Sequence, residues 1–207
     1  MQPPRVLPAG HRVAVFDFEH TLFAMRRFLR EQVFEALVPL GMSAKQFATH
    51  YRALANTYQE RLIPRGLCRR LAKECGTSIL QIEVAIAERL FSPAARDYLS
   101  HHINQLVARA RMSHDRLLLM CDGSEPYKQN WLRHVGIYSW FNPEEIILAR
   151  SKRVALQHHL GPVSHVTMVS GYQRDARDLA AVINKRGAAV LPIVTRHETL
   201  DRAIELL

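Results

Sequence analysis

The chain has 207 residues, of which 48% are hydrophobic, and a formal net charge of +9. This apolar content is enough to form a core and excludes an intrinsically disordered chain. No apolar run approaches the roughly 18 residues of a membrane-spanning helix, and the N-terminal segment lacks the apolar stretch of a signal peptide. We therefore expect no membrane association.

The first predicted element is a buried strand at residues 12–18, with the sequence RVAVFDF. Its β-branched and aromatic residues are typical of a parallel strand that is covered on both faces. The pattern then becomes helical. Helices are expected near residues 24–38, 43–58, 64–76 and 78–90, with no strand between them.

A long helix is expected over residues 92–111, opened by Pro93. Strands and helices alternate after it, and this alternation predicts right-handed parallel crossovers. The expected architecture is an α/β fold, a doubly wound five-stranded parallel sheet of order 3-2-1-4-5. The core would comprise residues 1–22 and 92–207, and residues 23–91 would form an inserted helical domain. The strands after the first are expected at residues 116–121, 145–149, 165–170 and 188–194.

Ligands bind at the carboxyl ends of the strands in such sheets, so polar residues that follow a strand are candidate site residues. The first strand ends in FDFEHTLF, which contains Asp17, Glu19 and Thr21. This segment resembles the first motif of the haloacid dehalogenase-like superfamily, Asp-x-Asp-x-Thr, with Glu19 in place of the second Asp. The resemblance implies a Rossmann-like core in which Asp17 is the nucleophile, Glu19 is the acid and base, and Thr21 fixes the loop.

The second strand ends in Cys121, Asp122 and Gly123. The superfamily has a Ser or Thr here that binds a phosphate oxygen, and Cys121 stands in its place with a weaker donor. Backbone N–H groups of the Asp122-Gly123 turn would cradle an oxyanion. Alternatively, Cys121 is a buried small apolar residue.

A basic residue after the next strand neutralises the reacting charge in this superfamily. Lys152 occupies the matching place, with Arg150 and Arg153 as rivals. Lys152 would open the next helix and would share the site with Asp17.

The resemblance implies a Mg²⁺ site after the fourth strand. Its ligands would be Asp17, Glu19 and either Asp175 or Asp178. Gly171 stands where the family has a further acid, so we expect weak Mg²⁺ binding, or none. Gly171→Asp should strengthen it.

Three functions are consistent with these motifs. The first is a phosphatase that acts on a small phosphorylated molecule through an aspartyl-phosphate on Asp17. The second is a metal-independent dehalogenase-type hydrolase, since Val169-Ser170 and Asp175 match the spacing of that branch. The third is a binding or regulatory protein that has lost activity. In all three, the helical insert resembles the cap of the phosphatase and dehalogenase branches.

The positive charge and the cysteines bear on partners and location. Basic residues occur in pairs such as Arg69-Arg70 rather than in long runs, so a solvated basic surface is favoured over a nucleic-acid platform. Cys68, Cys75 and Cys121 are odd in number and irregularly spaced, which predicts neither a disulfide framework nor a zinc site. A reducing, cytoplasmic setting is therefore expected.

Overall fold

The computed structural model of the chain divides into two compact units. The core unit comprises Met1–Ala24, Leu99–Ser124 and Gly136–Leu207, and the helical unit comprises Met25–Tyr98 and Glu125–Val135. The helical unit is thus larger than the expected insert of residues 23–91, because two further segments group with it. The structure describes residues 11–57, 65–123, 126–149, 152–160, 163–171, 173–184, 188–195 and 201–207.

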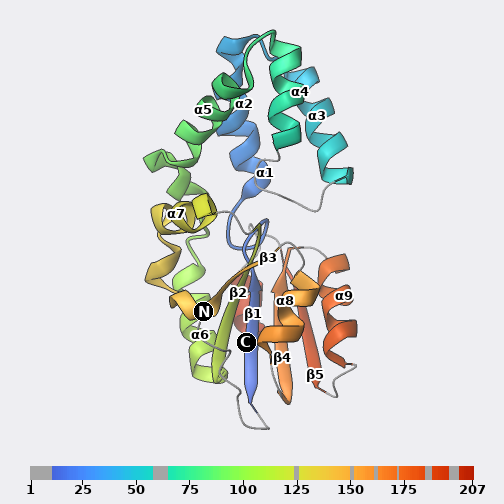
Figure 1. Cartoon of the computed structure of the whole chain (residues 1–207). Helices are drawn as coiled ribbons and strands as arrows, with labels where there is room; N and C mark the ends of the chain where they lie inside the picture. The colour runs from blue at the N-terminus through green and yellow to red at the C-terminus, as the bar shows by residue number, and fades with distance from the viewer. Residues whose placement is uncertain are drawn as a thin grey trace. The chain divides into compact units, whose positions relative to one another are not determined.

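A five-stranded parallel sheet forms the centre of the core unit (Figure 1). Its order, β3-β2-β1-β4-β5, is the one predicted from the alternating pattern. Five of the six residues of β1 are buried, as expected for the central strand of a sheet covered on both faces. The strands are β1 (Arg12–Asp17), β2 (Arg116–Asp122), β3 (Ile146–Ala149), β4 (His165–Ser170) and β5 (Ala189–Val194).

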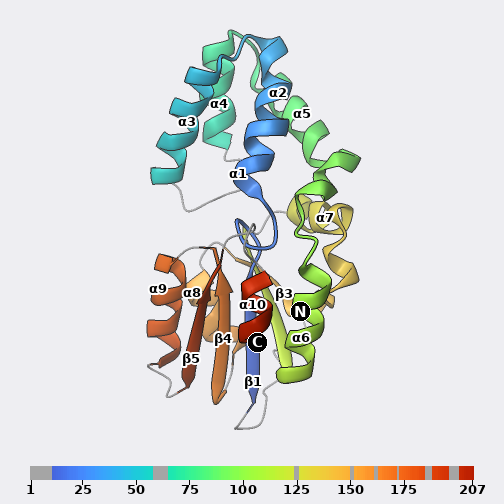
Figure 2. The ribbon, with the colours of Figure 1, turned by 180° about the vertical axis from the view of Figure 1, so that it is seen from behind.

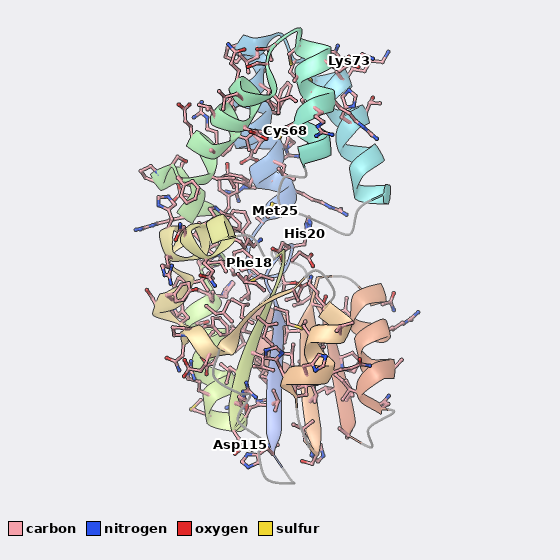
Figure 3. All side chains as sticks on the ribbon, viewed as in Figure 1. Phe18, His20, Met25, Cys68, Lys73 and Asp115 are labelled. Carbon is pink, nitrogen blue, oxygen red and sulfur yellow. The ribbon has the colours of Figure 1, made fainter. Side chains whose placement is uncertain are left out.

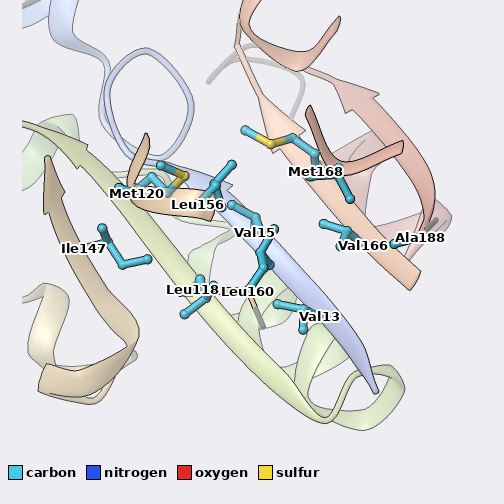
Figure 4. Packing of buried hydrophobic residues seen from close by; sticks show 12 residues of the cluster. Val13, Val15, Leu118, Met120, Ile147, Leu156, Leu160, Val166, Met168 and Ala188 are labelled. Carbon is cyan, nitrogen blue, oxygen red and sulfur yellow. The ribbon is translucent and has the colours of Figure 1, made fainter. Parts of the chain in front are cut away.

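Helices cover both faces of this sheet. Figure 1 shows α8 (Lys152–His159) and α9 (Gln173–Asn184) on one face. The reverse view shows α6 (Ile103–Ser113) and α10 (Asp201–Leu206) on the other (Figure 2). Apolar side chains of β1, β2 and β4 pack under α8, where Leu156 and Leu160 are almost fully buried (Figure 4).

The helical unit contains no strand in the part of it that the structure describes, in agreement with the predicted pattern. The predicted helix over residues 78–90 has a well-defined start, because Ser78 and Gln81 form a capping box at the beginning of α5. The elements are α1 (Met25–Phe28), a π-helical turn η1 (Leu29–Val33), α2 (Phe34–Leu37), η2 (Val38–Leu40), α3 (Ala44–Thr57), α4 (Arg65–Cys75), α5 (Ile79–Leu90), η3 (Pro93–Tyr98) and α7 (Pro126–Val135).

The predicted helix over residues 92–111 was wrong. The chain forms the short 3₁₀ helix η3 and then breaks before α6 begins at Ile103. At the break, Ser100 N–H donates to Leu22 O at 2.9 Å, and Leu99 forms a β-bridge with Phe23. These long-range backbone bonds to the loop after β1 satisfy groups that a continuous helix would have paired locally.

Two short 3₁₀ helices, η4 (Ile137–Ser139) and η5 (Pro143–Glu145), connect α7 to β3. None of the helices within the described ranges is long and apolar enough to cross a membrane.

Candidate active site

Asp17 is the last residue of the central strand and is almost completely buried, with 1% of its surface exposed. The chain turns sharply after it, since the N–H groups of Leu22 and Phe23 both donate to Phe18 O at 3.0 Å. Figure 3 shows Phe18 and His20 at this end of the sheet and Asp115 at the opposite end. Asp17 therefore lies at the carboxyl edge, as predicted.

His20 adopts a left-handed backbone conformation, with φ of 63°. Such a conformation costs free energy in a residue other than glycine and commonly occurs at functional sites. It lies between Glu19 and Thr21, so the strain falls within the predicted motif.

Lys152 contacts Asp17 directly. Its Nζ donates to Asp17 Oδ1 at 2.7 Å, across 135 positions of sequence. The alternation of side chains along β1 explains the pairing: Asp17 continues the face of Val15, which is packed under α8. Lys152 is the first residue of α8 and so reaches the same face of the sheet. Of the three basic candidates, Lys152 is the one the structure describes at Asp17; the side chains of Arg150 and Arg153 lie outside the described residues.

Asp122 provides a second carboxylate for the same ammonium group. Its Oδ2 lies 3.1 Å from Lys152 Nζ. Burial, followed by the nearby charge of Glu19, raises the pKa of Asp122 to about 8, and Lys152 only partly offsets this. The sequence did not pair the carboxyl group of Asp122 with Lys152. The alternation of side chains explains this contact, because Asp122 lies on the same face of β2 as Leu118 and Met120, which pack under α8.

The pKa of Lys152 is affected by two opposing influences. Burial alone would lower it, but the surrounding carboxylates, Asp17 foremost, hold it well above its ordinary value. Lys152 is therefore a permanent positive charge at the end of the sheet.

Glu19 is as buried as Asp17, and its Oε2 accepts the backbone N–H of Asp122 at 3.2 Å. Gly123, with φ of 103°, donates its own N–H to Ala149 O at 3.1 Å. Both N–H groups that were expected to cradle a substrate oxyanion thus have acceptors within the protein. A substrate oxygen would bind Asp122 N–H only by displacing Glu19.

Cys121 is fully buried and forms no disulfide. It pairs with Leu148 in the ladder of β2 and β3, and alternation puts its side chain on the face opposite Asp122. This placement favours the interpretation of Cys121 as a small apolar residue rather than a phosphate ligand.

Thr21 connects the loop after β1 to the end of β4. Its Oγ1 accepts the N–H of Gly171 at 2.6 Å, which is the loop-fixing role expected for it. The same approach leaves no room for a side chain at position 171: an added Cβ would lie 2.7 Å from His20 O. This packing argues against the expectation that Gly171→Asp strengthens metal binding, because a carboxylate could enter only if the backbone moved, and that expectation stays a prediction.

Ser170 is a site residue to which the sequence assigned no contact. Its Oγ donates to Asp17 Oδ2 at 3.3 Å from the end of β4. The register between β1 and β4, in which Phe16 pairs with Val169, brings Ser170 beside Asp17. The predicted acids Asp175 and Asp178 belong to α9, and their side chains lie outside the described residues.

The acids that the structure describes at this edge of the sheet do not by themselves fit a Mg²⁺ ion. Mg²⁺ demands near-octahedral oxygen ligation, usually with one or two carboxylates. Position 171 cannot supply a carboxylate, and Asp17 and Asp122 already share the ammonium of Lys152. Throughout the described ranges, no three His, Cys, Asp or Glu side chains form a group that could hold a metal ion.

No protein-family model and no curated protein matches this sequence. Solved structures do match the fold. A haloacid dehalogenase-like hydrolase from Burkholderia xenovorans has a TM-score of 0.70 at 13% identity, over 89% of this chain and 84% of that one. HAD-hydrolase YfnB from Bacillus subtilis, bound to magnesium, has a TM-score of 0.57 at 13% identity, over 96% and 99%.

A third match is CbbY from Rhodobacter sphaeroides in complex with phosphate, with a TM-score of 0.52 at 18% identity, over 90% of this chain and 88% of that one. At these identities the likeness concerns the fold. The chain has the haloacid dehalogenase-like fold, which the sequence motifs predicted.

Proposed function

We propose that this protein is a hydrolase that forms a covalent intermediate on Asp17, with a small phosphorylated molecule as its substrate. The observation that carries the proposal is the ion pair between Asp17 and Lys152 at the carboxyl edge of the central strand. A carboxylate held next to a fixed cation can act as a nucleophile towards an anionic group that would otherwise be repelled.

The reaction would proceed in two steps. An oxygen of Asp17 attacks phosphorus, the bond from phosphorus to the substrate oxygen breaks, and the departing alkoxide takes a proton from Glu19. Water then attacks phosphorus, Glu19 accepts its proton, and inorganic phosphate leaves with Asp17 regenerated. Lys152 would stabilise the negative charge on the transferred group throughout.

Two further facts support a phosphorylated substrate. The chain shares its fold with CbbY, which was solved with phosphate. Lys152 also carries its charge at all physiological pH values, because its pKa lies well above its ordinary value. We further propose that the helical unit acts as a cap that selects the substrate, as in enzymes with mobile lids.

A second candidate is favoured by the hydrogen bond from Ser170 to Asp17. A serine at this place matches the dehalogenase branch. In that reaction an oxygen of Asp17 attacks carbon, a halide ion leaves, and water hydrolyses the resulting ester at the carboxyl carbon of Asp17.

The test is hydrolysis of an aryl phosphate and, in parallel, of a 2-haloacid, by the wild type and Asp17→Asn. We expect turnover of the aryl phosphate that Asp17→Asn abolishes, since an amide is not a competent nucleophile. Asp115→Asn is the matched control, because Asp115 lies at the opposite end of the sheet and its side chain is 51% exposed.

A single turnover in heavy-oxygen water separates the two chemistries. Attack on phosphorus puts the label into phosphate, whereas ester hydrolysis puts it into Asp17. Absence of turnover with either substrate class would favour the third hypothesis, a binding or regulatory protein with this fold.

A further inference from the structure

The ammonium group of Lys152 occupies the point at which two carboxylates converge. Its Nζ lies 2.7 Å from Asp17 Oδ1 and 3.1 Å from Asp122 Oδ2. The side chains of Lys152, Asp17 and Asp122 are 11%, 1% and 12% exposed, so water screens this cluster little. A cation that bridges two buried carboxylates is the arrangement in which a divalent metal would otherwise be expected.

Two further carboxylate oxygens at this edge of the sheet also have donors from within the protein. Asp17 Oδ2 accepts the hydroxyl of Ser170, and Glu19 Oε2 accepts the N–H of Asp122. A metal ion would have to displace these donors and also lose most of its own water, which Mg²⁺ does reluctantly.

The packing at Gly171 closes one route to a metal ligand. A Cβ at this position would lie 2.7 Å from His20 O and 3.2 Å from Thr21 Oγ1. The backbone of His20 has a left-handed conformation, with its carbonyl oxygen at this point. Thr21 Oγ1 accepts a hydrogen bond from the N–H of Gly171. Glycine at 171 is thus part of the packing between the two loops.

We propose that Lys152 takes the place of the divalent cation in this protein, and that the site works without Mg²⁺. One fixed positive charge compensates Asp17 and also contacts Asp122, and its repulsion opposes entry of a metal ion between them. The part of this proposal that concerns turnover rests on the proposed function, whereas the part that concerns cation binding does not.

The direct test is titration of wild type and Lys152→Met with Mg²⁺ and with Mn²⁺ by calorimetry, together with thermal unfolding. The wild type should bind neither ion and show no shift in Tm. In Lys152→Met the buried carboxylate of Asp17 loses its cation, so Tm at neutral pH should fall. Added Mn²⁺ should raise Tm again and bind with a Kd at least roughly tenfold below the highest concentration at which the wild type shows no binding.

Two further variants make the result specific. Lys73→Met removes an exposed lysine of the helical unit and should behave as the wild type (Figure 3). Adding Asp17→Asn to Lys152→Met should abolish the gained Mn²⁺ binding, because it removes one of the converging carboxylates. If Lys152→Met does not fold, Lys152→Gln removes the charge while keeping a hydrogen-bond donor.

Tight Mg²⁺ binding by the wild type, lost in Asp175→Asn or Asp178→Asn, would overturn the proposal. So would phosphatase activity that disappears with a chelator and returns with Mg²⁺, although the proposed function would then stand. Gained Mn²⁺ binding in Lys152→Met, in a protein without activity on either substrate class, would support the cation replacement and contradict the proposed function.

Discussion

The imidazole of His114 lies 2.8 Å from the hydroxyl of Thr167, with both side chains buried on the α6 side of the sheet. His114 Nδ1 is 3.3 Å from Ala110 O, which can only accept, so the proton is assigned to Nδ1 and Nε2 accepts from Thr167. Burial is the main cause that lowers the pKa of His114. The pair therefore links α6 to β4 in its neutral form.

This pair predicts a loss of stability in acid. The unfolded chain takes up a proton at His114 near its ordinary pKa of 6.5, and the folded chain only at lower pH. The stabilising contribution of neutral His114 is thus fully present above pH 6.5 and is lost as the pH falls through the lowered pKa of the folded state. Thermal unfolding from about pH 5 to about pH 8 should show a weaker pH dependence in His114→Gln than in the wild type. His101→Gln, at an exposed position, should leave the profile unchanged.

Asp122→Asn should have the opposite pH signature. The pKa of Asp122 is 3.8 in its ordinary state and about 8 in the fold. Its protonated form therefore stabilises the fold at low pH, and this contribution is lost as pH rises to about 8. The free energy of unfolding of Asp122→Asn should therefore rise relative to that of the wild type as the pH increases from 3.8 to about 8. Above about pH 8 the difference between the two proteins should stay constant. A constant difference in Tm across that range would contradict the raised pKa, and Glu144→Gln, an exposed acid, serves as control.

Thr21→Val should destabilise the core unit through the loop at Gly171. The substitution keeps the shape of a fully buried side chain but removes the acceptor of Gly171 N–H. A donor left without an acceptor costs about 1–3 kcal/mol, which denaturant unfolding can measure. Thr21→Ser retains the hydroxyl and should recover most of that loss. Equal effects of the two substitutions would assign the role of Thr21 to packing.

Arg111→Lys tests a contact between α6 and η5. Arg111 donates to both carboxylate oxygens of Glu145 at 3.0 and 2.9 Å, and also to Trp140 O at 2.9 Å. Lysine cannot reproduce this planar fork, so the free energy of unfolding should fall by about 1 kcal/mol. Arg109→Lys, on the exposed face of the same helix, should have no measurable effect.

The sequence by itself determined the sheet and the position of Asp17. Short apolar, β-branched runs such as that of β1 favour buried strands, and strands that alternate with helices favour parallel pairing. Since every strand of such a sheet ends at the same edge, the polar residues that follow β1, β2 and β4 had to lie near one another. The choice of Asp17 and Lys152 among these residues, and the role of Thr21 in its loop, came from the resemblance to the haloacid dehalogenase-like motifs.

Tertiary structure alone decided which groups contact each other at that edge. The sequence does not show that the Asp122 carboxylate would share Lys152, or that Ser170 would reach Asp17, because both depend on the register between strands. The space at Gly171 and the break before α6 depend on the path of the loop after β1. Periodicity reports which face of an element is buried, whereas contacts at distances of about 3 Å depend on how separate elements are aligned.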